Sequence, residues 1–208
     1  MKRHGNLYQD IISRENLCEA YRTAKKGKSR MSSVRKFEKD VDGNLDTIRE
    51  SLAAKTFVTS QYQTKEIYEP KKRTIYVLPF APDRIVQHAL MHVIEPIWED
   101  LFIYDSYACR AGKGVHAGSI RAMEYVRKYR YCLKCDISKF YPSVQHNIIF
   151  DIVTHKIKCI DTLWLLHNNH HNWLQNIKEQ ISRRELPGLA VKAGWRREDL
   201  VHWKLCTP

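Results

Sequence analysis

The sequence predicts an α+β fold, in which amphipathic helices accompany a few short strands. Apolar residues recur at spacings of three and four along several segments, which is the pattern of helices packed on a core. Two β-rich runs, residues 61–68 and 74–78, flank a polar connector that contains Pro70, and this arrangement is typical of a hairpin. The chain has 208 residues, 43% of them hydrophobic, so it can form one good-sized domain with a core.

The first segment, residues 1–54, is predicted to be a helical and basic extension. Residues 7–21 form one expected helix. Residues 34–52 form a second, amphipathic helix despite Gly43. Between Tyr21 and Lys36 the chain contains no acidic residue. Arg22 and six further cations fall in or at the end of this stretch, and the six are Lys25, Lys26, Lys28, Arg30, Arg35 and Lys36.

Those six cations are candidate nucleic-acid-binding residues. The whole chain has a net charge of +12, which indicates a polyanionic partner. Neutralisation of phosphates by such residues predicts binding that depends strongly on salt and tolerates many sequences. The alternative is a solvated basic arm without a special role.

Other compositional features exclude some classes of protein. No apolar run approaches the length of a membrane span, and the basic start lacks the apolar core of a signal peptide. We therefore expect a cytoplasmic protein without a membrane partner. The six cysteines include no second Cys-x-x-Cys pair that would complete a zinc site. Reduced, mostly buried thiols are the better interpretation.

Three further helices are expected after the hairpin. Pro82 suits the first position of a helix, and apolar residues follow at helical spacing until Pro96 ends or kinks it. Asp83 lies in its first turn, where either a capping or a functional role is open. A helix over residues 116–129 carries apolar residues at helical spacing. Another helix follows Pro142 and should turn Ile148, Ile149, Ile152 and Val153 inward.

The stretch from Tyr131 to Val144, YCLKCDISKFYPSV, predicts a short strand that delivers a carboxylate to a turn. Alternation places Leu133 and Ile137 on one face and Asp136 on the other. A carboxylate beside a cleft suits Mg²⁺, which prefers hard oxygen ligands together with substrate phosphates. The alternative is a strand that ends in a capping Asp136 next to core aromatic residues.

The string DISKFY, residues 136–141, resembles the first catalytic motif of reverse transcriptases, which lies in the palm subdomain. It is most similar to the bacterial branch of group II introns, retrons and diversity-generating retroelements, of which the last is favoured. Three upstream segments resemble family segments in the same order: KKRTIYVLP (71–79) in the fingers, PDRIVQHAL (82–90) in the next helix, and SYACRAGKG (106–114) in a loop before a palm helix.

The resemblance implies a right-hand polymerase with fingers and a partial palm, and an RNA-directed DNA polymerase activity. Asp136 would be the catalytic residue and would bind Mg²⁺ together with the backbone carbonyl of Ile137. Tyr141 would lie under the incoming sugar, and Lys71 and Arg73 would contact the triphosphate. The implied partners are an RNA template, an RNA–DNA duplex and deoxynucleoside triphosphates. For the basic run that contains Lys71, a solvated turn is the alternative.

The chain departs from the family after residue 167. The second acidic motif, Tyr-x-Asp-Asp, is absent, as is a thumb, although metal-assisted transfer needs at least two carboxylates around a metal pair. We expect residues 55–167 to form the fingers and partial palm, and residues 168–208 to form a divergent, loosely ordered tail. The prediction is a truncated or frameshifted reverse transcriptase that is inactive by itself, unless an unidentified protein partner completes it. The alternative is a non-catalytic RNA-binding protein that keeps the fingers and the basic arm.

Overall fold

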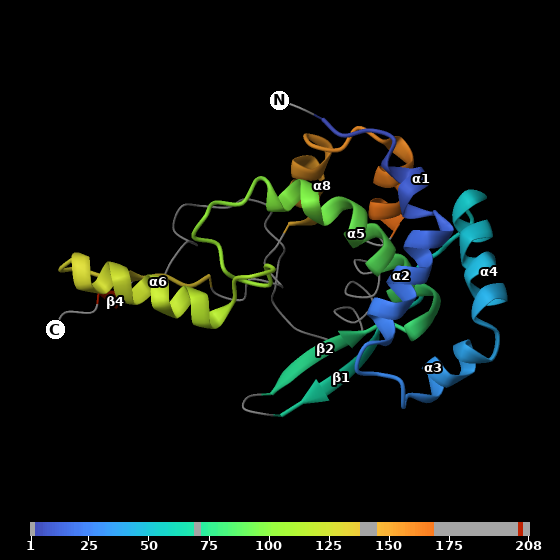
Figure 1. Ribbon diagram of the computed structural model, residues 1–208, viewed down its shortest axis with the longest axis horizontal. Helices are drawn as coiled ribbons and strands as arrows, with labels where there is room; N and C mark the ends of the chain where they lie inside the picture. Colours follow the sequence, from blue (N-terminus) through green and yellow to red (C-terminus); the bar gives the residue numbers. More distant parts are fainter. Residues whose placement is uncertain (1–2, 69–71, 138–144, 169–203, 206–208) are drawn as a thin grey trace, which may run out of the picture. The chain divides into compact units, whose positions relative to one another are not determined.

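The computed structural model describes residues 3–68, 72–137, 145–168 and 204–205. Helices dominate, and two small antiparallel sheets accompany them (Figure 1), so the predicted α+β class is confirmed. The chain divides into two compact units. Unit 1 comprises Met1–Ile97 and His146–Pro187, and unit 2 comprises Trp98–Gln145 and Gly188–Pro208. Each unit is described by itself below.

Unit 1 begins with four helices. They are α1 (Leu7–Ile11), α2 (Arg14–Lys25), α3 (Ser32–Phe37) and α4 (Val41–Ala53), with the 3-10 turn η1 (Glu38–Asp40) before α4. The side chain of Asp40 caps α4 by accepting a hydrogen bond from the Gly43 amide at 2.9 Å. A Cβ atom at position 43 would collide with that carboxylate. The single helix predicted over residues 34–52 is therefore interrupted, because the cap starts a new helix.

Helix α5 (Ile85–Glu99) provides much of the core of unit 1. It follows η2 (Phe80–Arg84) directly, and Pro96 lies inside it without ending it. Its buried residues are Ile85, Val86, Ala89, Leu90, Ile94 and Ile97. Asp83 is fully buried and accepts a hydrogen bond from the Ser60 amide at 2.8 Å, so it joins the preceding segment to the start of the helix.

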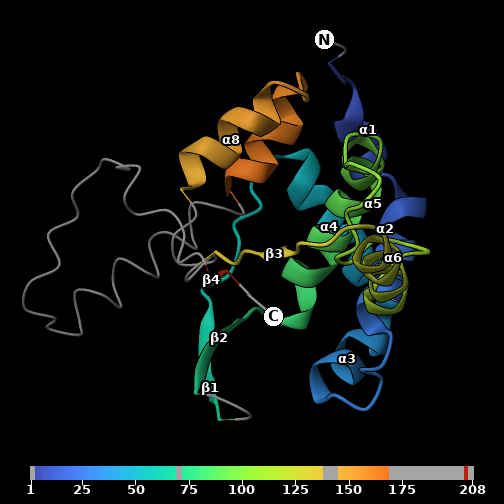
Figure 2. The same cartoon turned by 90° about the vertical axis from the view of Figure 1, so that its left-hand side faces the viewer.

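Helix α8 (His146–Thr154) and the helical residues 160–168 complete the described part of unit 1 (Figure 2). The N-terminal segment runs against this region. His4 forms a parallel bridge with Ile157, and the Arg3 guanidinium donates to the Thr154 carbonyl at 2.9 Å. The Tyr8 hydroxyl donates to the Leu52 carbonyl at 2.7 Å. Residues from both ends of unit 1 therefore share one core.

The predicted hairpin is confirmed in unit 1. Strand β1 (Gln63–Ile67) pairs with β2 (Arg73–Val77) in antiparallel register, from Gln63 opposite Val77 to Ile67 opposite Arg73. The connector between the strands includes residues 69–71, which lie outside the described part.

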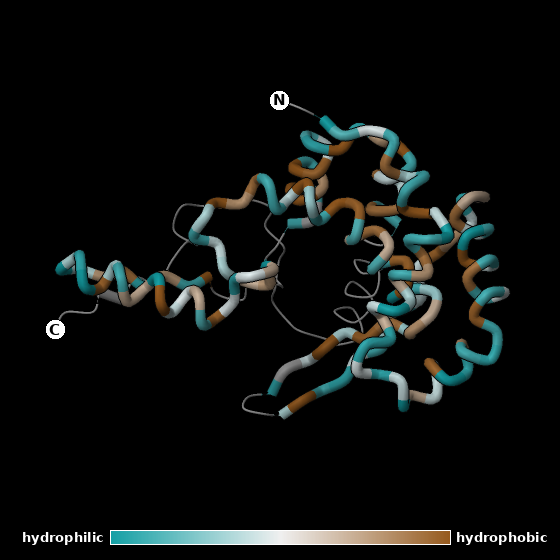
Figure 3. Tube along the Cα trace, in the orientation of Figure 1, coloured by the Kyte–Doolittle hydropathy of each residue, from teal (hydrophilic) through white to brown (hydrophobic). Residues whose placement is uncertain are grey.

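Unit 2 contains α6 (Val115–Lys128) and a two-stranded pair, β3 (Leu133–Lys134) with β4 (Lys204–Leu205). In unit 1, the expectation that α8 turns Ile148, Ile149 and Ile152 inward is wrong, because all three are exposed. On α6 of unit 2, Ile120, Met123 and Val126 are exposed as well. Hydrophobic and hydrophilic residues follow one another along this helix (Figure 3), and the described part of unit 2 contains no second helix that could cover it.

Two further expectations fail in unit 2. The predicted strand over residues 131–137 is only two residues long, and Leu133 and Ile137 are both exposed. Cys109, Cys132 and Cys135 are exposed thiols, not buried ones. Among the described residues, no helix combines the length and the apolar character that a membrane span requires.

Candidate nucleic-acid interface

The basic segment after α2 contains one cation that the fold itself uses. Lys25 forms an ion pair with Glu38, which also accepts a hydrogen bond from the Tyr21 hydroxyl at 3.1 Å. The Lys25 ammonium lies 5.8 Å from the centre of the Tyr21 ring. The hydrogen bond to Glu38 raises the pKa of Lys25, and the same bond lowers the pKa of Glu38. Lys25 therefore stabilises the junction between α2 and η1.

The other predicted cations of this segment are differently placed. Lys26, Arg30, Arg35 and Lys36 are exposed, and the described part of the chain gives none of them an ion pair. Lys28 is half-buried. Burial lowers the pKa of its ammonium group, and the nearby charge of Arg84 lowers that pKa further.

The end of η2 and helix α5 bring further basic residues to Lys28 that were not predicted from the sequence. Arg84, His88 and His92 follow one another at intervals of four, which places them on one helical face. The rings of His88 and His92 lie 6.4 Å apart. Burial lowers the pKa of His88, and the neighbouring His92, Lys28 and Arg84 add to this shift. The spacing of four from Arg84 to His92 was the available signal in the sequence.

The hairpin carries the residues predicted to contact a triphosphate. Arg73 starts β2 opposite Ile67, while Lys71 and the side chain of Arg73 lie outside the described residues. The adjacent Lys72 pairs with Glu66 at 3.1 Å, and its ammonium lies 5.7 Å from the centre of the Tyr68 ring. The role of Lys71 and Arg73 thus stays a prediction.

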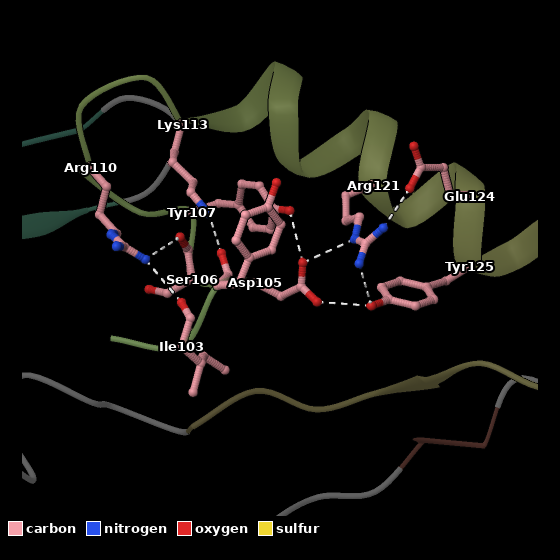
Figure 4. Close-up of polar contacts among 10 residues, drawn as sticks. Ile103, Asp105, Ser106, Tyr107, Arg110, Lys113, Arg121, Glu124 and Tyr125 are labelled. Atoms are coloured by element: carbon pink, nitrogen blue, oxygen red, sulfur yellow. Dashed lines mark hydrogen bonds and ion pairs between the residues drawn. The ribbon is translucent and has the colours of Figure 1, made fainter. Parts of the chain in front are cut away.

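The glycine-containing loop before α6 is held by its own cations, as Figure 4 shows. Arg110 donates to the Glu99 carboxylate at 2.8 Å and to the carbonyls of Ile103 and Ser106 at 3.0 and 3.2 Å. Lys113 donates to the Tyr104 carbonyl, and its ammonium lies 3.8 Å from the centre of the ring of the same residue. These cations order the loop from within.

Asp105 joins that loop to α6 (Figure 4). Its carboxylate accepts hydrogen bonds from Tyr125 at 2.9 Å, Tyr107 at 3.0 Å and Arg121 at 3.1 Å. The hydrogen bond from Tyr125, followed by those from the other two donors, lowers the pKa of Asp105. Arg121 also pairs with Glu124 at 2.8 Å. The network positions α6 on the loop, and the charge of Arg121 is balanced by Asp105 and Glu124.

The predicted metal-binding residues lie in unit 2, next to one another in the chain. Asp136 and Ile137 are exposed, and the Asp136 carboxylate accepts a hydrogen bond from the Ile137 amide at 3.0 Å. Its second oxygen and the Ile137 carbonyl are of the hard type that suits Mg²⁺. Within the described ranges, no three His, Cys, Asp or Glu side chains gather into a metal site. Tyr141, the predicted sugar gate, lies outside these ranges.

Comparison with known proteins gives two partial similarities. No protein-family model matches the chain. It is 29% identical over 125 residues to the protein YkfC of Escherichia coli, which covers 54% of this chain and 31% of YkfC. It is 25% identical over 101 residues to the putative COX1/OXI3 intron 2 protein of Saccharomyces cerevisiae, which covers 43% of this chain and 12% of the yeast protein. The matched region therefore spans less than a third of either of these proteins.

Proposed function

We propose that this chain is a reverse-transcriptase family member that binds an RNA template or RNA–DNA duplex, and that by itself it does not polymerise DNA. The observation that carries the RNA-binding part is the basic surface of unit 1. There, four exposed cations and the half-buried Lys28 form no ion pair among the described residues. Together with the net charge of +12, this surface suits a polyanion with repeated phosphates.

The family part of the proposal rests on the sequence. Four segments between residues 71 and 144 resemble reverse-transcriptase segments in the same order. The yeast protein that shares 25% identity with the chain is an intron protein by name. Intron proteins form one branch of the resemblance, and the name agrees with that resemblance.

The catalytic part concerns Asp136. When bound, Mg²⁺ would neutralise the triphosphate and align the reacting oxygens. The Asp136 carboxylate and the Ile137 carbonyl would hold it. In-line transfer with a metal pair requires a second carboxylate, which the family supplies from the Tyr-x-Asp-Asp motif that this sequence lacks. This is why we propose that the chain alone is inactive.

Primer extension on an RNA template, with Mg²⁺ or Mn²⁺, tests the catalytic part. We expect no extended product from the wild-type chain. The matched variants are Asp136→Ala and Asp151→Ala, the second of which removes an exposed carboxylate on α8. Product that is lost in Asp136→Ala and kept in Asp151→Ala would show that the chain polymerises, and the proposal of inactivity would then be wrong.

A non-catalytic RNA-binding protein is the second candidate, favoured by the absence of the Tyr-x-Asp-Asp motif from the sequence. The two candidates differ in nucleotide binding. A reverse-transcriptase fingers hairpin should bind a deoxynucleoside triphosphate with Mg²⁺ and lose this binding in Lys71→Gln and Arg73→Gln. A protein that only binds RNA should show no such nucleotide binding, with or without the two substitutions.

A further inference from the structure

One cluster of half-buried basic side chains in unit 1 has no carboxylate to balance it. Lys28 comes from the turn after α2, Arg84 from the end of η2, and His88 from the second turn of α5. All three are half-buried. In the part of the chain that the structure describes, none of them forms an ion pair.

This arrangement costs the folded state free energy. Removing a charge from water is unfavourable, and a neighbouring like charge adds to the cost. Both effects are present at Lys28, whose pKa is lowered by burial and by Arg84. An anion bound between the three side chains would remove the repulsion and replace the lost hydration. Asp83, which precedes Arg84 in the chain, is fully buried and accepts a hydrogen bond from the Ser60 amide through Oδ1. Among the described residues it forms no ion pair with the cluster.

The packing of α2 on α5 fixes the cluster. The Asn16 amide group donates to the carbonyls of Ile11 at 3.0 Å and Ala89 at 2.9 Å. The Asn16 side-chain oxygen must therefore be the acceptor for the Nδ1–H of His92, 3.1 Å away. His92 is thus used as a link between the two helices. Because α2 leads into the turn that carries Lys28, this link helps to hold Lys28 beside Arg84.

We propose that Lys28, Arg84 and His88 bind a backbone phosphate of a single-stranded RNA template. The inference rests on the proposed RNA binding and gives it a location. The guanidinium of Arg84 can bond two phosphate oxygens at once, and Lys28 contributes a point charge. A ring N–H of His88 can donate to another oxygen. The adjacent start of α5 adds the positive end of the helix dipole.

The surroundings favour a polymer over a free nucleotide. Lys26 and Arg30 are exposed on the same segment as Lys28, so cations follow one another along it. Such a line suits a strand with repeated phosphates. A nucleoside triphosphate arrives with Mg²⁺, which is usually bound through one or two carboxylates. None of the three cluster residues is a carboxylate, so the cluster itself offers no such ligand for the metal.

Fluorescence anisotropy of the full chain with a short labelled single-stranded RNA tests the inference. The variants are Lys28→Gln and Arg84→Gln, and the control is Arg22→Gln. Arg22 is exposed on α2 and pairs with Glu19 at 3.2 Å, so its removal changes the net charge equally without touching the cluster. We expect each cluster variant to bind roughly tenfold more weakly and to lose about 0.7 from the slope of log affinity against log salt. The control should stay close to wild type.

Three other outcomes are distinguishable. If the wild type binds RNA, and Lys28→Gln and Arg84→Gln have the same affinity and salt slope as Arg22→Gln, the phosphate site is overturned but the proposed function stays in place. Failure of the wild-type chain to bind RNA would overturn both. Labelled deoxyadenosine triphosphate that binds the wild type and not Arg84→Gln would assign the cluster to a nucleotide and overturn the backbone assignment. Thermal melting shows whether each variant is folded. If Arg84→Gln is unfolded, the RNA affinity of Lys28→Gln tests the phosphate site alone, since Lys28 lies outside the helices.

Discussion

Asn16 on α2 and His92 on α5 are joined by a hydrogen bond of 3.1 Å between the amide oxygen and Nδ1. The same Asn16 side chain donates to carbonyls of α1 and α5, so one partly buried residue connects three helices. A buried polar group is favourable only while its partners are present. The stability of unit 1 and the shape of its basic surface therefore depend on the same residue.

Asn16→Ala should destabilise the chain by about 2 kcal/mol, because it removes three hydrogen bonds and leaves buried partners unsatisfied. Urea unfolding followed by circular dichroism measures the loss. Asn147→Ala, which removes an exposed side chain from α8, is the matched control and should cost far less. Equal losses in the two variants would contradict the placement of Asn16 between the helices.

Tyr8→Phe should cost about 1 kcal/mol. The Tyr8 hydroxyl donates to the Leu52 carbonyl at 2.7 Å inside unit 1, and burial, followed by the charges of Asp161 and Cys159, raises its pKa to about 12. It therefore stays a protonated donor at neutral pH. Tyr131→Phe removes a hydroxyl from a side chain that is 84% exposed and should have no effect. The melting temperatures of Tyr8→Phe and Tyr131→Phe, each compared with that of the wild type, test this prediction. An equal change in both variants would contradict it.

His88 should make the chain less stable as the pH falls. Burial first, and then the charges of His92, Lys28 and Arg84, lower its folded pKa below the usual histidine value of about 6.5. The unfolded chain takes up the proton first, so this group's contribution is lost as the pH falls from about 6.5 through the lower folded pKa. His88→Gln should flatten the dependence in urea unfolding at a series of pH values. An unchanged slope would show that His88 is not shielded as described.

Two elements were predicted correctly from patterns among residues that are close in the sequence. The hairpin followed from two β-rich runs around Pro70, and α5 followed from the apolar spacing after Pro82. The break before α4 was missed, because a cap made by Asp40 overrides the apolar periodicity that continues through it. The inward face predicted for α8 was also wrong, since Ile148, Ile149 and Ile152 are exposed and burial depends on a packing partner that helical spacing alone does not supply.

The residues of the candidate nucleic-acid interface likewise include some that the sequence pattern selected and some that it missed. Lys28 was selected because it lies in a run of cations, which is visible in the sequence. Arg84 and His88 were missed, since their closeness to Lys28 arises only when α2 packs on α5. Lys25 was assigned to the nucleic-acid surface from the same run, and the structure also places it in an ion pair with Glu38, beyond the acid-free stretch. The roles of Asp136, Ile137, Tyr141, Lys71 and Arg73 stay predictions.

The most direct measurement of the central claim is the affinity of the full chain for single-stranded RNA across a series of salt concentrations. Release of counterions from phosphates makes log affinity fall linearly with log salt, by about 0.7 for each phosphate contact. The exposed cations and the Lys28 cluster predict several such contacts, and therefore a steep loss of binding between low and physiological salt. An affinity that stays flat over this range would contradict an RNA surface formed by these residues.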